Sequence, residues 1–153
     1  MQPDPRTLHQ LQAARRLRVM QREKADRLHE RSREALRQAQ ERFDLEQADY
    51  HEILERLGQH ARAGARFDPA QHEQRLLAQQ AAHARIEARR RDLVEAQTVQ
   101  QQALAELLKC KVNQDVADKA CQRIAEALRQ VREHRESIDV FDSQQARRAA
   151  HGL

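Results

Sequence analysis

The chain has 153 residues, of which 34% are charged and only 3% aromatic, and its formal net charge at pH 7 is +4. Globular cores are built largely from big aromatic and aliphatic side chains, so this composition argues against a compact globular core. The small number of glycines and prolines, three of each, argues against disorder. The abundance of Ala, Leu, Gln, Glu and Arg favours long helices instead.

The first predicted helix spans about residues 5–57. Asp4 followed by Pro5 is a start signal, because Asp caps a first helical turn and Pro suits the first helical position. Gly58 follows Leu57 and predicts the helix end, with Gly58 in the left-handed capping conformation. A stripe of residues spaced about three and four apart runs along this helix. It consists of Ala25, Leu28, Ser32, Ala35, Ala39, Phe43, Glu46, Tyr50, Ile53 and Leu57.

A loop at about residues 58–68 precedes the second predicted helix, which spans about residues 69–142. Asp68 and Pro69 repeat the start signal. The tail at residues 143–153 lacks a clear stripe and is expected to fray. Two sets of residues in this helix each repeat every seven positions, which is the pattern of a left-handed coiled coil. One set is Ile86, Leu93, Gln100, Leu107, Gln114, Cys121, Leu128 and Arg135, and the other is Ala96, Ala103, Cys110, Ala117, Ile124, Val131 and Ile138.

So short a loop requires the second helix to fold back on the first. The predicted fold is therefore all-α, a long two-helix antiparallel coiled-coil hairpin that forms a single domain over residues 1–153. With the turn centred near residue 63, the second helix has no partner beyond about residue 121. The apolar stripe in that region is then exposed and predicts a binding surface. Its residues are Cys121, Ile124, Leu128, Val131 and Ile138.

Residues that could support catalysis or metal binding are not arranged for it. No two of the eight His stand four residues apart, and there is no His-Glu-x-x-His motif or Gly-rich phosphate loop. Cys110 and Cys121 fall on seam positions, where they are expected to be packing residues. We therefore expect no enzymatic activity, no metal and no cofactor.

Charge and hydropathy bear on the other classes of partner. Short basic clusters, such as Arg89 to Arg91, alternate with acidic residues, so they are expected to be solvated helix faces and not a nucleic-acid site. No apolar run is long enough to span a bilayer, and no signal-peptide core lies near Met1. These features predict a soluble, cytoplasmic chain without direct membrane insertion.

The layout of a short N-terminal segment, a helix, a short loop near the middle and a longer second helix resembles the FliJ/YscO-type stalk proteins of flagellar and type III secretion systems. Those proteins are similar to the central γ-subunit stalk of rotary ATPases. Leu76 and His83 show the spacing of a Leu and a His that contact the export gate in that family. His72 and Gln79 stand where the family has an aromatic and a small apolar residue. Phe43 and Tyr50 are the aromatic residues of the first helix that are available to match aromatic residues of that family.

The resemblance implies a non-enzymatic stalk or adaptor that links a hexameric secretion ATPase to an export-gate membrane protein and escorts secretion chaperones. It places the chain in the cytoplasm, peripheral to the inner-membrane secretion apparatus, as a monomer in solution. The gate end would use Phe43, Tyr50, Leu76 and His83. The ATPase end would use Ile124, Leu128, Val131, Ile138, Arg123 and Arg132.

Two other functions fit the same sequence. A structural coiled coil that serves as a scaffold or tether would form a strong homodimer. A nucleic-acid-binding coiled coil that works through its Arg clusters would bind with a steep dependence on salt.

Overall fold

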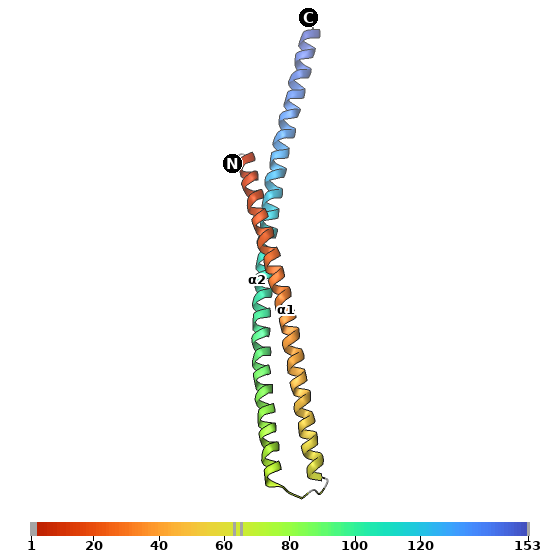
Figure 1. Ribbon diagram of the computed structural model, residues 1–153. Coiled ribbons are helices and arrows are strands. Elements are labelled where there is room, and N and C mark those ends of the chain that lie inside the picture. The colour runs from red at the N-terminus through yellow and green to blue at the C-terminus, as the bar shows by residue number, and fades with distance from the viewer. Residues whose placement is uncertain (1–2, 63, 65, 153) are drawn as a thin grey trace. The chain divides into compact units, whose positions relative to one another are not determined.

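The computed structural model describes residues 3–62, 64 and 66–152, and within these it contains two helices and no strand. Helix α1 spans Pro5–Arg62 and helix α2 spans Pro69–His151 (Figure 1). The predicted all-α helical hairpin is therefore confirmed.

Both helices begin where the sequence predicts. The Asp4 carboxylate accepts a hydrogen bond from the Arg6 backbone N–H at 2.9 Å, and the Asp68 carboxylate accepts one from the Ala70 N–H at 3.0 Å. Each Asp thus satisfies a backbone donor that has no partner within its helix. The following Pro has no N–H to satisfy, which explains why the same Asp-Pro pair opens both helices.

The predicted end of the first helix was wrong. Helix α1 continues through Gly58 to Arg62, and the glycine in the left-handed region is Gly64, with φ at 63°. A single glycine costs a helix about 1 kcal/mol relative to alanine, and the residues after Gly58 are compatible with continued helix. The chain therefore turns only after Arg62.

The expected fraying of the C-terminal tail was also wrong, because α2 is helical to His151. Residues 143–151 contain no glycine or proline, and a helix that is already nucleated adds one hydrogen bond for each further residue. The Gly152 N–H donates to the Arg148 carbonyl at 2.9 Å and closes the last turn. Helix formation here needs no apolar stripe.

The chain divides into two compact units, where the sequence predicted one domain. Unit 1 comprises Met1–Lys24 with Leu108–Leu153, and unit 2 comprises Ala25–Leu107. Each unit contains a segment of both helices.

Unit 2 is an antiparallel two-helix hairpin. Three contacts set its register: Arg85 Nε with Glu46 Oε2 at 3.2 Å, the His83 and Tyr50 rings at 6.2 Å, and Gln100 Nε2 with His29 Nε2 at 3.3 Å. In these pairs the two residue numbers add to between 129 and 133, and not to 126 as predicted. The turn is therefore centred near residue 66, midway between the helix ends at Arg62 and Pro69.

The seam of α2 matches both predicted sets over most of its length. Every predicted member from Ile86 to Leu128 is buried or half-buried, whereas Val131, Arg135 and Ile138 are exposed. The predicted stripe of α1 contains two errors, because Leu28 and Ala35 are exposed while His29 and Leu36 are half-buried. Strict steps of three and four from Ala25 lead to His29 and Leu36, so the coiled-coil period prevails over residue type at these positions.

Unit 1 pairs the start of α1 with the segment of α2 that begins at Leu108. Cys110 and Cys121 are both buried, as expected of packing residues. Arg15 forms an ion pair with Asp118 at 2.5 Å. Within this unit α2 continues well past the N-terminal end of α1 (Figure 1).

Candidate partner-binding surfaces

The C-terminal segment of α2 over residues 129–151, here called the overhang, has no packing partner among the residues that the structure describes. Every side chain in it is exposed. Ile124 and Leu128 are half-buried, so they belong to the coiled coil. The predicted start of the unpaired segment, at about residue 121, was therefore too early. The turn lies about three residues later than predicted, and each residue of α1 consequently reaches further along α2.

The residues predicted for the ATPase end thus separate into two groups. Ile124 and Leu128 face α1, whereas Val131 and Ile138 are exposed on the overhang. Arg123 and Arg132 are also exposed, one before the overhang and one within it. The four predicted apolar residues therefore do not form one free stripe.

Phe141 is an apolar residue of the overhang that the sequence reasoning missed. It is 58% exposed and stands three residues after Ile138, which is 45% exposed, so the two side chains share a helix face. Phe141 lies outside the two seven-residue sets, which explains why the heptad pattern alone did not identify it. The simple i, i+3 spacing of large apolar residues could have found it.

Ion pairs in and before the overhang are concentrated around Arg129. Its guanidinium lies 2.7 Å from Glu126 and 3.7 Å from Glu133. The hydrogen bond that Arg129 donates to Glu126, and then the charges of Glu126 and Glu133, raise the pKa of Arg129 above its ordinary value. In the described part of the chain Arg132, Arg135, Asp139 and Asp142 form no ion pair. Their charges are free to meet a partner.

The residues predicted for the gate end lie in unit 2 and are only partly brought together. The Tyr50 and His83 rings meet edge to face at 6.2 Å. Phe43 lies two turns before Tyr50 on α1 and contacts Arg90, whose guanidinium carbon is 5.9 Å from the ring centroid. Leu76 is exposed and lies nearer the loop. The four residues therefore do not form one patch.

Leu76 lines a groove of about 450 Å³ beside the loop, and Phe67 lines the same groove. Phe67 is 73% exposed, and its ring lies 5.3 Å from that of His72. Arg66 and Arg75 add positive charge to the groove walls. The sequence reasoning missed Phe67 because it lies in the loop, outside any helical period. A large aromatic residue in a loop next to a helix cap was the available signal.

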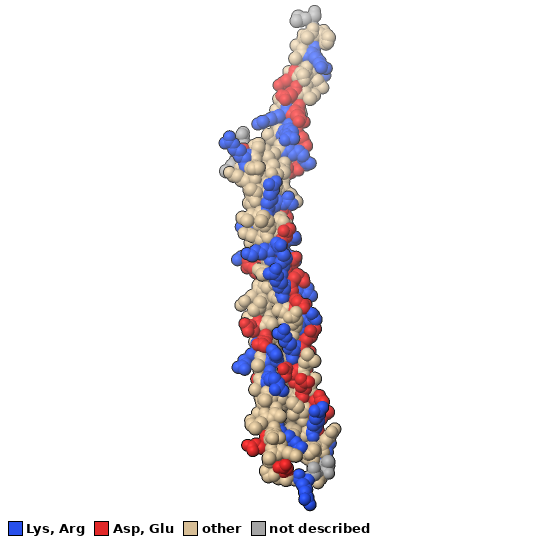
Figure 2. Space-filling view, in the orientation of Figure 1, with Lys and Arg blue, Asp and Glu red and all other residues tan. Residues whose placement is uncertain are grey.

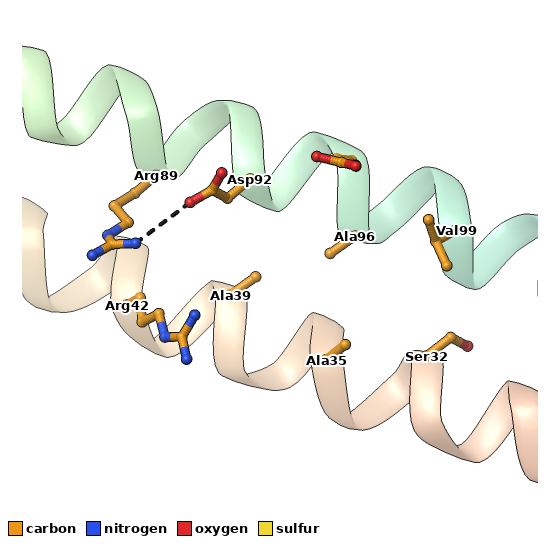
Figure 3. Close-up of a pocket in the computed structure, with 9 residues that line it drawn as sticks. Ser32, Ala35, Ala39, Arg42, Arg89, Asp92, Ala96 and Val99 are labelled. Carbon is orange, nitrogen blue, oxygen red and sulfur yellow. Dashed lines mark hydrogen bonds and ion pairs between the residues drawn. The ribbon is translucent and has the colours of Figure 1, made fainter.

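A second groove, of about 280 Å³, runs between the helices of unit 2 where the seam is made of small residues. Ala39 of α1 and Ala96 of α2 point into the space between the helices, and the exposed Ala35 also lines the groove (Figure 3). Arg89 lies at one end of this groove, 3.4 Å from Asp92. The groove is open, and Ser32 and Glu95 also line it. It marks the loosely packed stretch of the seam.

Charges of both signs are interspersed over the face seen in Figure 2. No helix among the described residues is long and apolar enough to cross a membrane. Within residues 3–62, 64 and 66–152, no group of three or more His, Cys, Asp or Glu side chains is placed to hold a metal ion.

Compared with known protein families, curated proteins and solved structures, the chain matches no family model, no curated protein and no solved structure.

Proposed function

We propose that the chain is a non-enzymatic stalk or adaptor of a hexameric secretion ATPase, and that the overhang is the end that meets the ATPase ring. The observation that carries the proposal is that α2 remains helical after its coiled-coil contacts end, with Val131, Ile138 and Phe141 exposed on it. Each large apolar side chain that a partner covers would contribute about 1.5–3 kcal/mol. An exposed helix of this kind suits insertion into a cavity lined by other subunits.

The loop end would then meet an export-gate membrane protein. The groove beside the loop supports this part of the proposal, because it combines the exposed Phe67 and Leu76 with Arg66 and Arg75. An aromatic residue flanked by Arg is the composition that recurs at the centres of protein interfaces. The chain would work in the cytoplasm beside the secretion apparatus and would also escort secretion chaperones.

A stalk of this kind would act mechanically. A helix whose faces differ in charge and apolarity makes different contacts with each of six identical subunits, and those differences bias the states of the subunits. The chain would need no cofactor for this.

The test is binding to the hexameric secretion ATPase of the same organism. The double variant Val131→Asp with Ile138→Asp puts charge on the overhang face, where both side chains are exposed in the free protein. Burying unpaired charge costs several kcal/mol, so we expect loss of ATPase capture and of any change in the rate of ATP hydrolysis. The circular dichroism of the variant should match that of the original chain.

The matched control replaces Leu77 and Val94 with Asp, since both are exposed apolar residues of α2 that lie in unit 2. This variant should bind the ATPase as the original chain does. If the overhang variant also binds normally, the ATPase contact is not on the overhang.

A scaffold function is the second candidate. It is favoured by a row of exposed apolar residues four apart on α2 in unit 1, namely Leu108, Val112 and Val116. Such a row forms a ridge that another helix could cover. Two results together would favour the scaffold. The original chain would not bind the ATPase, and replacing both Val112 and Val116 with Asp would abolish its self-association.

A further inference from the structure

The overhang continues the coiled-coil period of α2 after α1 has ended. The seam positions that follow Leu128 are Val131, Arg135, Ile138 and Asp142. All four side chains are exposed, and α2 is helical throughout. This segment therefore presents a coiled-coil face that lacks its second helix.

We propose that this face binds the overhang of a second copy of the chain, with the two helices antiparallel. In an antiparallel coiled coil each seam position of one helix lies level with the other seam position of its partner. By that rule Arg135 lies level with Ile138 of the second copy, and Val131 lies level with its Asp142. Two-fold symmetry makes each of these pairs occur twice.

The flanking residues provide the charge complementarity for this arrangement. In an antiparallel pair the residues on one flank of the seam face the same flank of the other helix. Arg132 then faces Asp139 of the second copy, and this ion pair also forms twice. On the other flank His134 faces Phe141 of the second copy. Arg132 and Asp139 form no ion pair in the described part of the chain, so both are available.

A parallel arrangement of the two overhangs is disfavoured by the charged seam residues Arg135 and Asp142. It would place Arg135 against Arg135 and Asp142 against Asp142 on the seam. Like charges that directly oppose each other destabilise a coiled coil, and flanking charges are the usual determinant of helix orientation. The overhang sequence therefore selects the antiparallel pair.

Helix α1 limits how far the pairing can extend. In this register Ala149 of the second copy would lie level with Ile124, which α1 already half-covers. The contact is thus confined to roughly residues 128–145, with Val131 and Ile138 as its main apolar residues and Asp142 at its edge. An interface of this size gives a weak dimer that dissociates on dilution.

A weak dimer at this place has a consequence for the proposed function. The second copy and the ATPase ring would compete for Val131 and Ile138, so free protein would cover its own docking end until the ring displaces the second copy. This consequence rests on the proposed function. The dimer itself does not, because it is measured on the purified chain alone.

The test is sedimentation velocity on the full chain from about 5 to 500 µM, a range that brackets weak association. We expect a concentration-dependent dimer. Arg132→Asp alone or Asp139→Arg alone should weaken it about tenfold, since each change creates two pairs of like charges. The double variant Arg132→Asp with Asp139→Arg should restore the affinity to within about threefold, because the two ion pairs form again with reversed sign.

Arg91→Asp is the control for charge change, since Arg91 is exposed on α2 in unit 2. It should leave the dimer unchanged. A monomer over the whole concentration range overturns the proposal, as does a dimer that neither single variant weakens. Weakening by both single variants without recovery in the double variant overturns the antiparallel register.

Discussion

Gln100 of α2 lies across the seam of unit 2 from His29 of α1, with 3.3 Å between the two side-chain Nε2 atoms. The Ser32 hydroxyl donates to the His29 backbone carbonyl at 2.7 Å, so this buried hydroxyl also has a hydrogen-bond partner. Gln114, another glutamine of the seam, differs. Its Oε1 atom is buried and has no hydrogen-bond partner among the described residues.

This difference predicts opposite effects for two similar substitutions. Gln114→Leu should raise the free energy of unfolding by about 1–2 kcal/mol, because it removes an unsatisfied carbonyl and adds apolar surface to the seam. Gln100→Leu should lower it by about 1 kcal/mol, because His29 loses its partner. Thermal unfolding followed by circular dichroism measures both. The double variant His29→Leu with Gln100→Leu should recover the loss, and equal effects of the two single variants would contradict the prediction.

Gly58 and Gly64 should also respond in opposite directions to alanine. Gly58 is helical, and an added Cβ would meet nothing within 4 Å, so Gly58→Ala should stabilise the chain by about 1 kcal/mol. Gly64 has a φ of 63°, which is strained for alanine, so Gly64→Ala should destabilise by about 1 kcal/mol. Chemical denaturation checks both values. If Gly58→Ala were the destabilising variant, Gly58 would be the helix cap instead.

The titration of Glu34 should depend on Arg37. The hydrogen bond from Arg37, and then that from Gln38, lower the pKa of Glu34 below its ordinary value. A lowered pKa in the folded state means that Glu34 favours folding at pH above the ordinary carboxylate range. That contribution is lost as the pH falls through the lowered pKa. Arg37→Gln should therefore raise the Glu34 pKa, as measured by carbon-detected NMR of the carboxyl group.

Arg33→Gln is the control for this experiment, because Arg33 lies 3.5 Å from Glu30 and has no ion pair with Glu34 among the described residues. Arg33→Gln should leave the pKa of Glu34 unchanged. An equal shift in both variants would mean that general charge, and not the hydrogen bond from Arg37, sets the Glu34 pKa.

Removing the two ends of the chain should have unequal effects. Deleting residues 131–153 removes only exposed side chains among those described, so the melting temperature of dilute protein should stay the same while the helical signal falls. Deleting residues 1–14 removes the half-buried Leu8 and Leu11 and uncovers Ile124 and Leu128. That deletion should lower the melting temperature. A drop caused by the first deletion would show that the overhang packs within the chain.

Local chemistry alone determined the helix starts and most of the α2 seam. Asp4 and Asp68 cap their helices as predicted, since capping depends on residues a few positions apart. The seven-residue repeat of α2 likewise depends only on the helical period, and it identified buried positions from Ile86 to Leu128. For the candidate binding surfaces, the sequence patterns identified Val131 and Ile138 correctly as exposed, but they missed the exposed Phe67 and Phe141.

The pairing of the two helices decided the end of α1, the register between α1 and α2, and the start of the exposed segment. Gly58 could cap a helix or continue it, and only the structure, in which α1 runs on to Arg62, distinguishes these. That end fixes the centre of the turn, and the turn sets which residue of α1 lies beside each residue of α2. A displacement of a few residues there leaves Ile124 and Leu128 covered by α1 and begins the exposed segment after Leu128. Register depends on the sum of contacts along both helices, so no local stretch of sequence contains it.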